Sequence, residues 1–196
     1  MSPQFESEIA VVPAETRECS ATERELLLRL AHDSIQTALE GRGRELDLTP
    51  PSPHLAEPRG AFTTLHLQGK LRGCIGYILP VESLYKTVAD TARAAAFEDP
   101  RFEPVTLDDA PELKVEISVL SRPRPIRPDE LTVGRHGLIV SQGSHRGLLL
   151  PQVPTEWDWD RETFLSETCL KAGLPPNAWQ HGAQLQAFTA EVFGEE

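Results

Sequence analysis

Prolines divide this chain into short segments and so limit the elements that it can form. The 196-residue sequence holds 17 prolines, where average usage predicts about 10. Proline fixes φ and lacks the N–H that helices and sheets need. The prolines gather at 50–53, 100–104 and 123–128. The sequence therefore predicts loops, turns and extended connections over much of the chain.

Charge and cysteine usage narrow the possible partners and location. Nineteen Lys and Arg against 30 Asp and Glu give a net charge of −11. Such a field repels phosphate backbones and anionic lipid surfaces, so we expect no membrane partner and consider nucleic acid unlikely. No apolar run approaches the roughly 18 residues of a membrane span. Three widely spaced cysteines, Cys19, Cys74 and Cys169, fit reduced thiols, which predicts a cytoplasmic protein.

The pattern of apolar residues predicts an α+β fold. Residues 1–19 are acidic and aperiodic, which predicts a flexible N-terminal arm before a domain over 20–196. Within that domain, helices are expected at about 20–41, 82–97 and 160–173, and strands at 61–67, 70–78, 113–119, 137–140, 147–150 and 186–193. Hairpins joined by isolated helices, with no repeating βαβ pattern, indicate a mainly antiparallel sheet with a few packing helices.

The segment Leu71–Gly76 carries the most chemistry. Arg72 and Cys74 alternate along a predicted strand, so we expect them to share one face. A guanidinium beside the thiol would favour the thiolate, which attacks electrophiles or binds metal. Gly73 and Gly76 mark a bulge or a close approach by another backbone or a ligand. A buried structural cysteine is the alternative.

Glu116 is a second candidate, in a strand whose Val115 and Ile117 face the opposite side. Its carboxylate could form a structural salt bridge or contact solvent. If it lay across the sheet from Arg72, the pair could hold a polar ligand, or Glu116 could act as an acid or base.

No cofactor or metal is predicted. The histidines lack metal-site spacing, and a zinc or iron site would have to be assembled from distant residues, with His66, His136, His145, Cys74 and Cys169 as the available pool. The usual nucleotide-binding and serine-hydrolase motifs do not occur.

Several segments together resemble a known family. Leu71-Arg72-Gly73-Cys74-Ile75-Gly76 matches the hallmark of the AMMECR-type domain family, which includes AmmeMemoRadiSam system protein A. Five further segments agree in the same order: Ala95–Phe102, Val115–Ser121, Gly134–Val140, Arg146–Val153 and Thr168–Pro175. The resemblance covers about residues 20–193.

The resemblance implies a single two-lobed α+β domain with a cleft near the hallmark segment. Bacterial members are similar to components of a system with a Memo-like protein and a radical S-adenosylmethionine enzyme, which implies these two as partners. An older suggestion for the family is regulation of transcription or translation.

Three functions remain open on this basis. The first is an accessory binding protein that holds a small polar ligand or peptide end with Arg72, Gly73, Gly76, Arg101 and Phe102, and with Glu116 to orient the ligand. The second is an enzyme with Cys74 as nucleophile or metal ligand and Glu116 as acid or base. The third is a regulator that binds nucleic acid.

Overall fold

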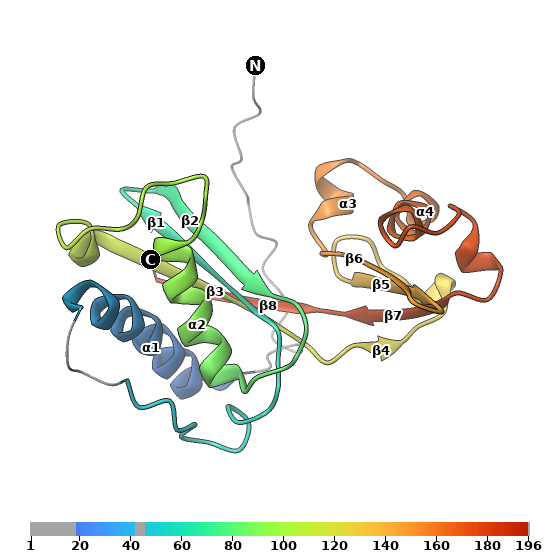
Figure 1. Ribbon diagram of the computed structural model, residues 1–196. Helices are drawn as coiled ribbons and strands as arrows, with labels where there is room; N and C mark the ends of the chain where they lie inside the picture. The colour runs from blue at the N-terminus through green and yellow to red at the C-terminus, as the bar shows by residue number, and fades with distance from the viewer. Residues whose placement is uncertain (1–18, 42–45, 196) are drawn as a thin grey trace. The chain divides into compact units, whose positions relative to one another are not determined.

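The computed structural model describes residues 19–41 and 46–195, which belong to two compact units (Figure 1). Of the described residues, the first unit takes 19–41, 46–119 and 191–195, and the second takes 120–190. The predicted N-terminal arm lies outside the described residues except for Cys19, which is buried in the core of the first unit.

Helices and antiparallel sheets make up both units. The first unit contains α1 (Ala21–Glu40), β1 (Ala61–Leu67), β2 (Lys70–Tyr77), α2 (Leu84–Phe97), β3 (Leu113–Leu120, whose last residue begins the second unit) and most of β8 (Ala190–Gly194). The second unit contains β4 (Arg124–Pro125), β5 (Gly137–Gln142), β6 (His145–Leu149), α3 (Val153–Glu156), α4 (Arg161–Lys171) and β7 (Gln184–Phe188). Short 3₁₀ helices occur at Ala110–Glu112, Pro128–Glu130 and Ala178–Gln180. The α+β prediction is confirmed.

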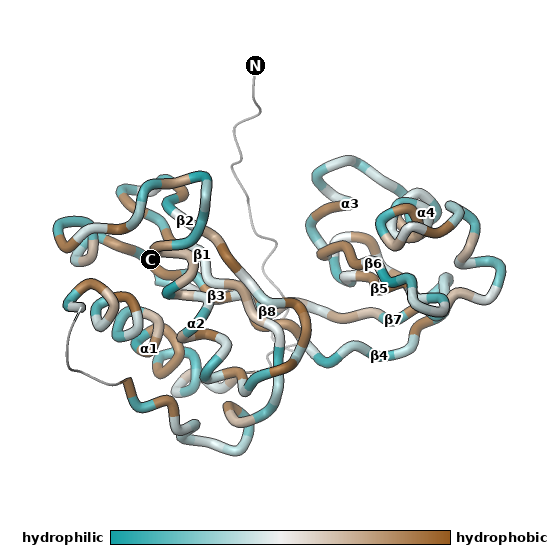
Figure 2. The backbone as a smooth tube through the Cα atoms, in the orientation of Figure 1, coloured by the Kyte–Doolittle hydropathy of each residue, from teal (hydrophilic) through white to brown (hydrophobic). Residues whose placement is uncertain are grey.

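The first helix begins and ends where its sequence signals predict. The Ser20 hydroxyl accepts the N–H of Glu23, and the Glu23 carboxylate accepts the N–H of Ser20, which completes a capping box. Gly41 ends the helix with a φ of 65°, a conformation that glycine adopts without strain. Hydrophobic and hydrophilic positions alternate around α1 (Figure 2), and Leu27 and Ile35 are fully buried against the core.

The first unit is built on a four-stranded sheet in the order β2-β1-β3-β8. The hairpin β1–β2 turns at Gln68 and Gly69, which both have positive φ. Thr63 and Leu65 of β1 are buried on the face that α1 and α2 cover (Figure 1), and the Thr63 hydroxyl lies 2.8 Å from that of Thr91 in α2. Because strand side chains alternate, the intervening residues lie on the opposite face, here called the back face.

The second unit has a separate sheet in the order β4-β7-β5-β6, covered by α4. Asp160 caps α4 by accepting the N–H of Thr163 at 2.8 Å, as the sequence predicts. Phe164 and Cys169 of α4 pack with Leu138 and Val140 of β5 to form the core of this unit.

The prediction of one final strand over 186–193 is wrong. Residues 184–194 form two strands, β7 in the second sheet and β8 in the first. Thr189 separates them, because its N–H bonds to the Ser121 hydroxyl and its carbonyl accepts the N–H of Ser121. These long-range bonds leave no local sequence signal.

In residues 19–41 and 46–195, no helix combines the length and hydropathy required to cross a membrane.

Candidate functional site

The hallmark segment lies in β2, the edge strand of the first sheet. Its pairing with β1 is irregular: Leu65 lies opposite Gly73, while His66 lies opposite Leu71. Arg72 is therefore the extra residue of a β-bulge. The bulge interrupts the strict alternation on which the prediction of a shared Arg72 and Cys74 face rested.

Arg72 binds a loop of its own unit. Its guanidinium donates to the carbonyl of Glu103, to the carbonyl of Pro104 at 3.0 Å and to the carboxylate of Asp109 at 3.2 Å. Within the part of the chain that the structure describes, no bond joins Arg72 to Glu116. The Arg72 side chain thus fixes the 103–109 loop.

The two hallmark glycines allow close packing inside the protein. A Cβ on Gly73 would lie 2.1 Å from the carbonyl oxygen of Ala95 in α2, and a Cβ on Gly76 would lie 2.1 Å from the ring of Phe62. Both distances are far shorter than a van der Waals contact. Each glycine is therefore explained without a ligand.

Cys74 is held at its backbone by a neighbouring ion pair. The Asp99 carboxylate accepts the N–H of Cys74 at 2.9 Å, and the Arg101 guanidinium donates to the carbonyl of Cys74 at 3.4 Å. Asp99 in turn accepts from the N–H, Nε and Nη2 of Arg101. These hydrogen bonds with Arg101 hold the pKa of Asp99 well below its usual range, although burial opposes the shift. We call this pair the Asp99–Arg101 clamp.

The arginine that reaches Cys74 is thus Arg101. Its hydrogen bonds to Asp99 raise its pKa, and the charge of Cys74 adds to this effect. The guanidinium lies over the ring of Phe102, 5.3 Å from the centroid. Because the Arg101 side chain is 56% exposed, it presents a positive charge beside a half-buried thiol.

Cys74 and Glu116 lie in one row across the back face. Thr64 of β1 pairs with Cys74 of β2 on one side and with Glu116 of β3 on the other. The Thr64 hydroxyl donates to the sulfur of Cys74 at 3.2 Å. Two strand spacings separate Cys74 from Glu116, which is about 10 Å between backbones. The two sequence candidates therefore share a surface without direct contact.

Glu116 is half-buried, and no hydrogen bond or ion pair described for this chain reaches its carboxylate. Burial raises its pKa, and the positive charge that His66 can carry opposes this. Its oxygens are not among the fully buried polar atoms without a partner, so water can reach them, and partial burial makes the charged form less favourable than it is in free solvent. A donor supplied by a ligand can replace this water.

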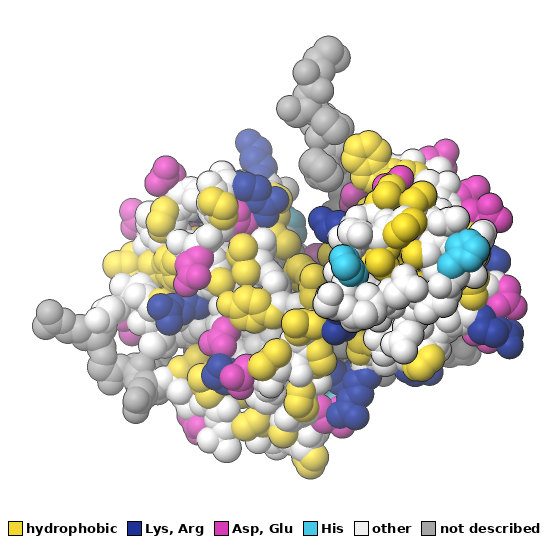
Figure 3. Space-filling model, turned by 45° about the vertical axis from the view of Figure 1, so that its right-hand side comes forward, with side chains coloured by type: hydrophobic (Ala, Val, Ile, Leu, Met, Phe, Trp, Pro, Cys, Tyr) yellow, Lys and Arg dark blue, Asp and Glu magenta, His cyan; other side chains and the backbone are white. Residues whose placement is uncertain are grey.

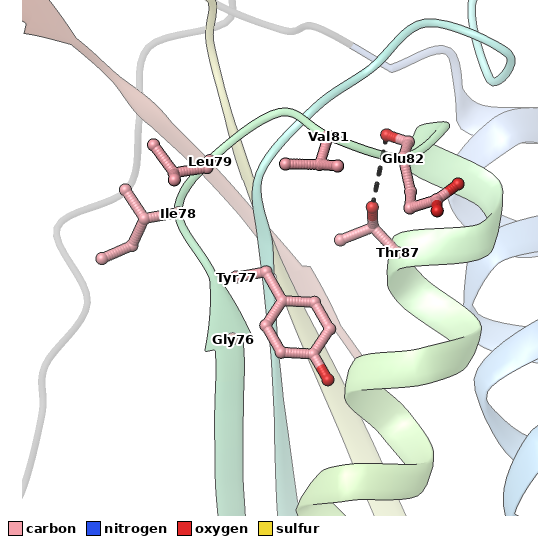
Figure 4. Close-up of a pocket in the computed structure, with 7 residues that line it drawn as sticks. All are labelled: Gly76, Tyr77, Ile78, Leu79, Val81, Glu82 and Thr87. Carbon is pink, nitrogen blue, oxygen red and sulfur yellow. Dashed lines mark hydrogen bonds between the residues drawn. The ribbon is translucent and has the colours of Figure 1, made fainter.

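A hollow of about 350 Å³ follows the end of β2. It is lined by Gly76, Tyr77, Ile78, Leu79, Val81, Glu82 and Thr87 (Figure 4). Several of these side chains are apolar and exposed, and Figure 3 shows hydrophobic side chains at the surface of the first unit among charged ones. Of the residues that the sequence analysis placed at a ligand cleft, Gly76 alone lines this hollow, so a cleft at the hallmark segment remains a prediction.

Among the described residues, no group of three or more His, Cys, Asp or Glu side chains could hold a metal ion. Cys169, which the sequence analysis included among the possible zinc or iron ligands, is buried in the core of the second unit.

Comparison with other proteins gives the same family that the hallmark segment resembles. The profile of the AMMECR1 family matches residues 28–193. The chain belongs to the AMMECR1 family. A protein of Thermococcus gammatolerans is 47% identical over 187 residues, covering 88% of this chain and 90% of the relative. Protein PF1979 of Pyrococcus furiosus is also 47% identical, covering 88% of each chain.

The AMMECR1 fold is also known from a solved structure. The crystal structure of uncharacterized protein PH0010 from Pyrococcus horikoshii aligns with a TM-score of 0.71 at 43% identity. The alignment covers 92% of this chain and 95% of that one.

The sequence did not single out two residues of this AMMECR1 site. Asp99 lies in Ala95–Phe102, one of the segments that resemble the family, but no local sequence pattern links it to Cys74. Thr64 alternates with buried residues of β1, so only its strand could be predicted. Both depend on long-range pairing.

Proposed function

We propose that this AMMECR1 protein is a binding protein that holds a small polar ligand or a peptide end beside Cys74, as an accessory component of an AmmeMemoRadiSam-like system. Glu116 accepts hydrogen bonds from the ligand on the back face. Arg101 and Phe102 contribute a positive charge and an apolar surface at the edge of β2.

The unpartnered carboxylate of Glu116 carries this proposal. The carboxylate is half-buried in a row with Thr64 and Cys74, and its pKa is raised by burial. Perturbed carboxylates of this kind concentrate at functional sites because folding alone does not favour them. A ligand that donates N–H or O–H groups to the Glu116 carboxylate would offset the free-energy cost of its partial burial.

The clamp supports binding in a second way. Because Asp99 and Arg101 fix both backbone groups of Cys74, the row needs little ordering when a ligand binds. Arg72, Gly73 and Gly76 support the same segment through the 103–109 loop, α2 and Phe62. We assign these three residues to the framework of the site.

An enzyme that uses Cys74 is the second candidate. The Thr64 hydroxyl donates to the Cys74 sulfur, and Arg101 reaches the Cys74 carbonyl, so a substrate at the thiol would meet a hydrogen-bond donor and a cation. Glu116 lies about 10 Å away across β1, too far to accept a proton from Cys74 directly. A substrate would have to contact both Cys74 and Glu116 on the back face for the two residues to act in one reaction.

Thermal shift with a panel of amino acids, dipeptides, small amines and small carboxylates tests the two candidates. For a binding protein, a panel member should raise the melting temperature of the wild type, Cys74→Ala and Cys74→Ser, but not of Glu116→Gln. The exposed Glu103→Gln serves as the matched control and should respond as the wild type. Turnover of a panel member that Cys74→Ser abolishes, with folding intact, would instead establish the enzyme.

The accessory role is tested with the purified Memo-like protein and radical S-adenosylmethionine enzyme of the same organism. We expect a complex with at least one of them in sedimentation velocity. No complex at about 10 μM of each protein would refute this part of the proposal. Retention on nucleic acid that falls steeply with salt would support the regulator in its place.

A further inference from the structure

We propose that the outer edge of β2 at Gly76 binds the C-terminal end of a partner polypeptide. The peptide adds to the sheet as an antiparallel strand and brings its terminal carboxylate to Arg101. This inference rests on the proposed binding function and specifies the class of its ligand.

The backbone of β2 leaves one edge position open. Cys74 directs its N–H and C=O to the clamp, so Thr64 and Cys74 form a pair without mutual hydrogen bonds. Because bonded and non-bonded pairs alternate in antiparallel sheets, Gly76 also directs its N–H and C=O outward. No hydrogen bond of the described residues reaches these two groups. An unpaired N–H and C=O on an edge strand form a template for another strand.

The hollow next to Gly76 provides apolar contacts for an added strand. Tyr77, Leu79 and Val81 are 45%, 53% and 75% exposed. In Figure 4, Ile78 and Leu79 point away from α2, while the ring of Tyr77 lies on the α2 side. The volume of about 350 Å³ can accept one or two side chains of a peptide. Alternate side chains of the added strand thereby meet apolar surface on both sides of β2.

The clamp determines which end of the peptide lies at Cys74. It occupies the next outward-facing backbone groups along the edge, so an added strand must stop there. Arg101 offers a charged guanidinium at this point, and its Nη1 takes part in no hydrogen bond of the described chain. Although Asp99 already pairs with this guanidinium through Nε and Nη2, a free carboxylate can accept a charge-assisted hydrogen bond from Nη1. The peptide therefore ends beside Arg101 and runs back toward Leu79, antiparallel to β2.

Charge further restricts the peptide. Glu82 lines the hollow, and the whole chain carries a net charge of −11. Lys86 pairs with Glu82 at 3.4 Å and Asp99 pairs with Arg101, so it is the net charge that disfavours acidic side chains upstream in the peptide. The terminal carboxylate still meets a donor in the Nη1 of Arg101. The C-terminal tail therefore has apolar side chains at alternate positions and no acidic side chain beside Glu82.

Fluorescein-labelled hexapeptides with alternating Val and Thr, ending in Leu, are the probe, each made with a free and with an amidated C-terminus. Fluorescence anisotropy with the full-length protein should show binding that weakens by about 10-fold or more on amidation, because a charge-assisted contact to Arg101 is lost. Hydrogen exchange of the Gly76 amide, followed by NMR, should slow when the free-acid peptide is bound.

Surface variants separate this site from other hydrophobic contacts. Val81→Asp and Leu79→Asp should weaken binding by about 10-fold without harming the fold, since both side chains are more than half exposed. Leu170→Asp is the matched control, because Leu170 is an exposed apolar residue of the second unit, 50% exposed. It should bind the peptide as the wild type does.

Three results would overturn the inference: equal affinity for free and amidated peptides, unchanged exchange at Gly76, or no binding at about 1 mM peptide. Concentration-dependent dimerisation that Val81→Asp abolishes would assign the edge to a second copy instead. If peptides fail while panel ligands still stabilise the wild type but not Glu116→Gln, the docking site fails and the proposed function stands. If neither probe binds, both are refuted.

Discussion

The carboxylate of Asp99 accepts the backbone N–H of Cys74 at 2.9 Å, although the two residues are 25 positions apart in the chain. The same carboxylate binds the guanidinium of Arg101, which reaches the carbonyl of Cys74. One buried acid therefore fixes both the hallmark strand and the cation beside it.

Replacing Asp99 by Asn should loosen this arrangement. The Asp99 side chain is only 2% exposed, and the amide keeps an acceptor for Cys74 but loses the ion pair with Arg101. We expect the free energy of unfolding to fall by about 2 kcal/mol, a moderate value because Arg101 is partly solvated. Urea denaturation measures the change, with the exposed Asp108→Asn as control. Equal midpoints for the two variants would show that the clamp contributes nothing to stability.

Stability should depend on pH through Glu23. Burial opposes its ionisation, but the Ser20 N–H and the hydroxyls of Ser52 and Ser20 outweigh this and lower its pKa from 4.5 to about 2. Because the folded pKa lies below the unfolded one, the stabilisation is complete above pH 4.5 and is lost as the pH falls toward 2. The loss should be roughly 3 kcal/mol.

Chemical denaturation between pH 2 and pH 6 follows this effect. The Glu23→Gln variant should lose the part of the pH dependence that belongs to Glu23 and keep the part that belongs to Asp99, whose pKa is also lowered, whereas the exposed Glu25→Gln should keep the full slope of the wild type. The assignment fails if both variants retain the slope of the wild type.

Gly73→Ala tests the close packing of β2 on α2. The added methyl would overlap the Ala95 carbonyl, which belongs to backbone and cannot rotate away. We expect a loss of about 3 kcal/mol. Gly143→Ala is the comparison: its Cβ meets nothing within 4 Å, but its φ is 60°, so strain should cost about 1 kcal/mol. Thermal unfolding shows which variant loses more stability. A smaller loss for Gly73→Ala than for Gly143→Ala would contradict the packing explanation.

Glu116→Gln should stabilise the protein near neutral pH. Burial raises the pKa of Glu116, so the folded state favours its protonated form. The penalty of the charged carboxylate is absent below the unfolded pKa and appears as the pH rises through the folded one. The melting temperature of the variant should exceed that of the wild type at pH 7 and match it near pH 3. A destabilised variant at pH 7 would mean that the carboxylate is satisfied within the fold.

Cys74 should react with iodoacetamide before the other thiols. Cys19 and Cys169 are buried, whereas Cys74 is partly exposed, so its labelling should be faster by about 10-fold or more. Mass spectrometry of tryptic peptides locates the label. Rapid labelling of Cys74→Ser at another cysteine would contradict the burial pattern.

The sequence by itself determined the elements whose signals are local. Ser20 and Glu23 fixed the start of α1, Gly41 fixed its end, and Gln68-Gly69 fixed the turn of the first hairpin. These signals act over a few residues, so the nearby sequence contains all the atoms involved. The hallmark segment and the five further segments that follow it in order likewise indicate the AMMECR-type family from the sequence alone.

Only the tertiary structure decided how the site is assembled. It brought Arg101 to Cys74, directed Arg72 to the 103–109 loop, and set Thr64 between Cys74 and Glu116. Strand register and loop contacts depend on residues far apart in the chain, and a single bulge shifts which side chains lie opposite one another. The same reason explains the division of residues 184–194 into β7 and β8 at Thr189, where the bonds to Ser121 span 68 positions.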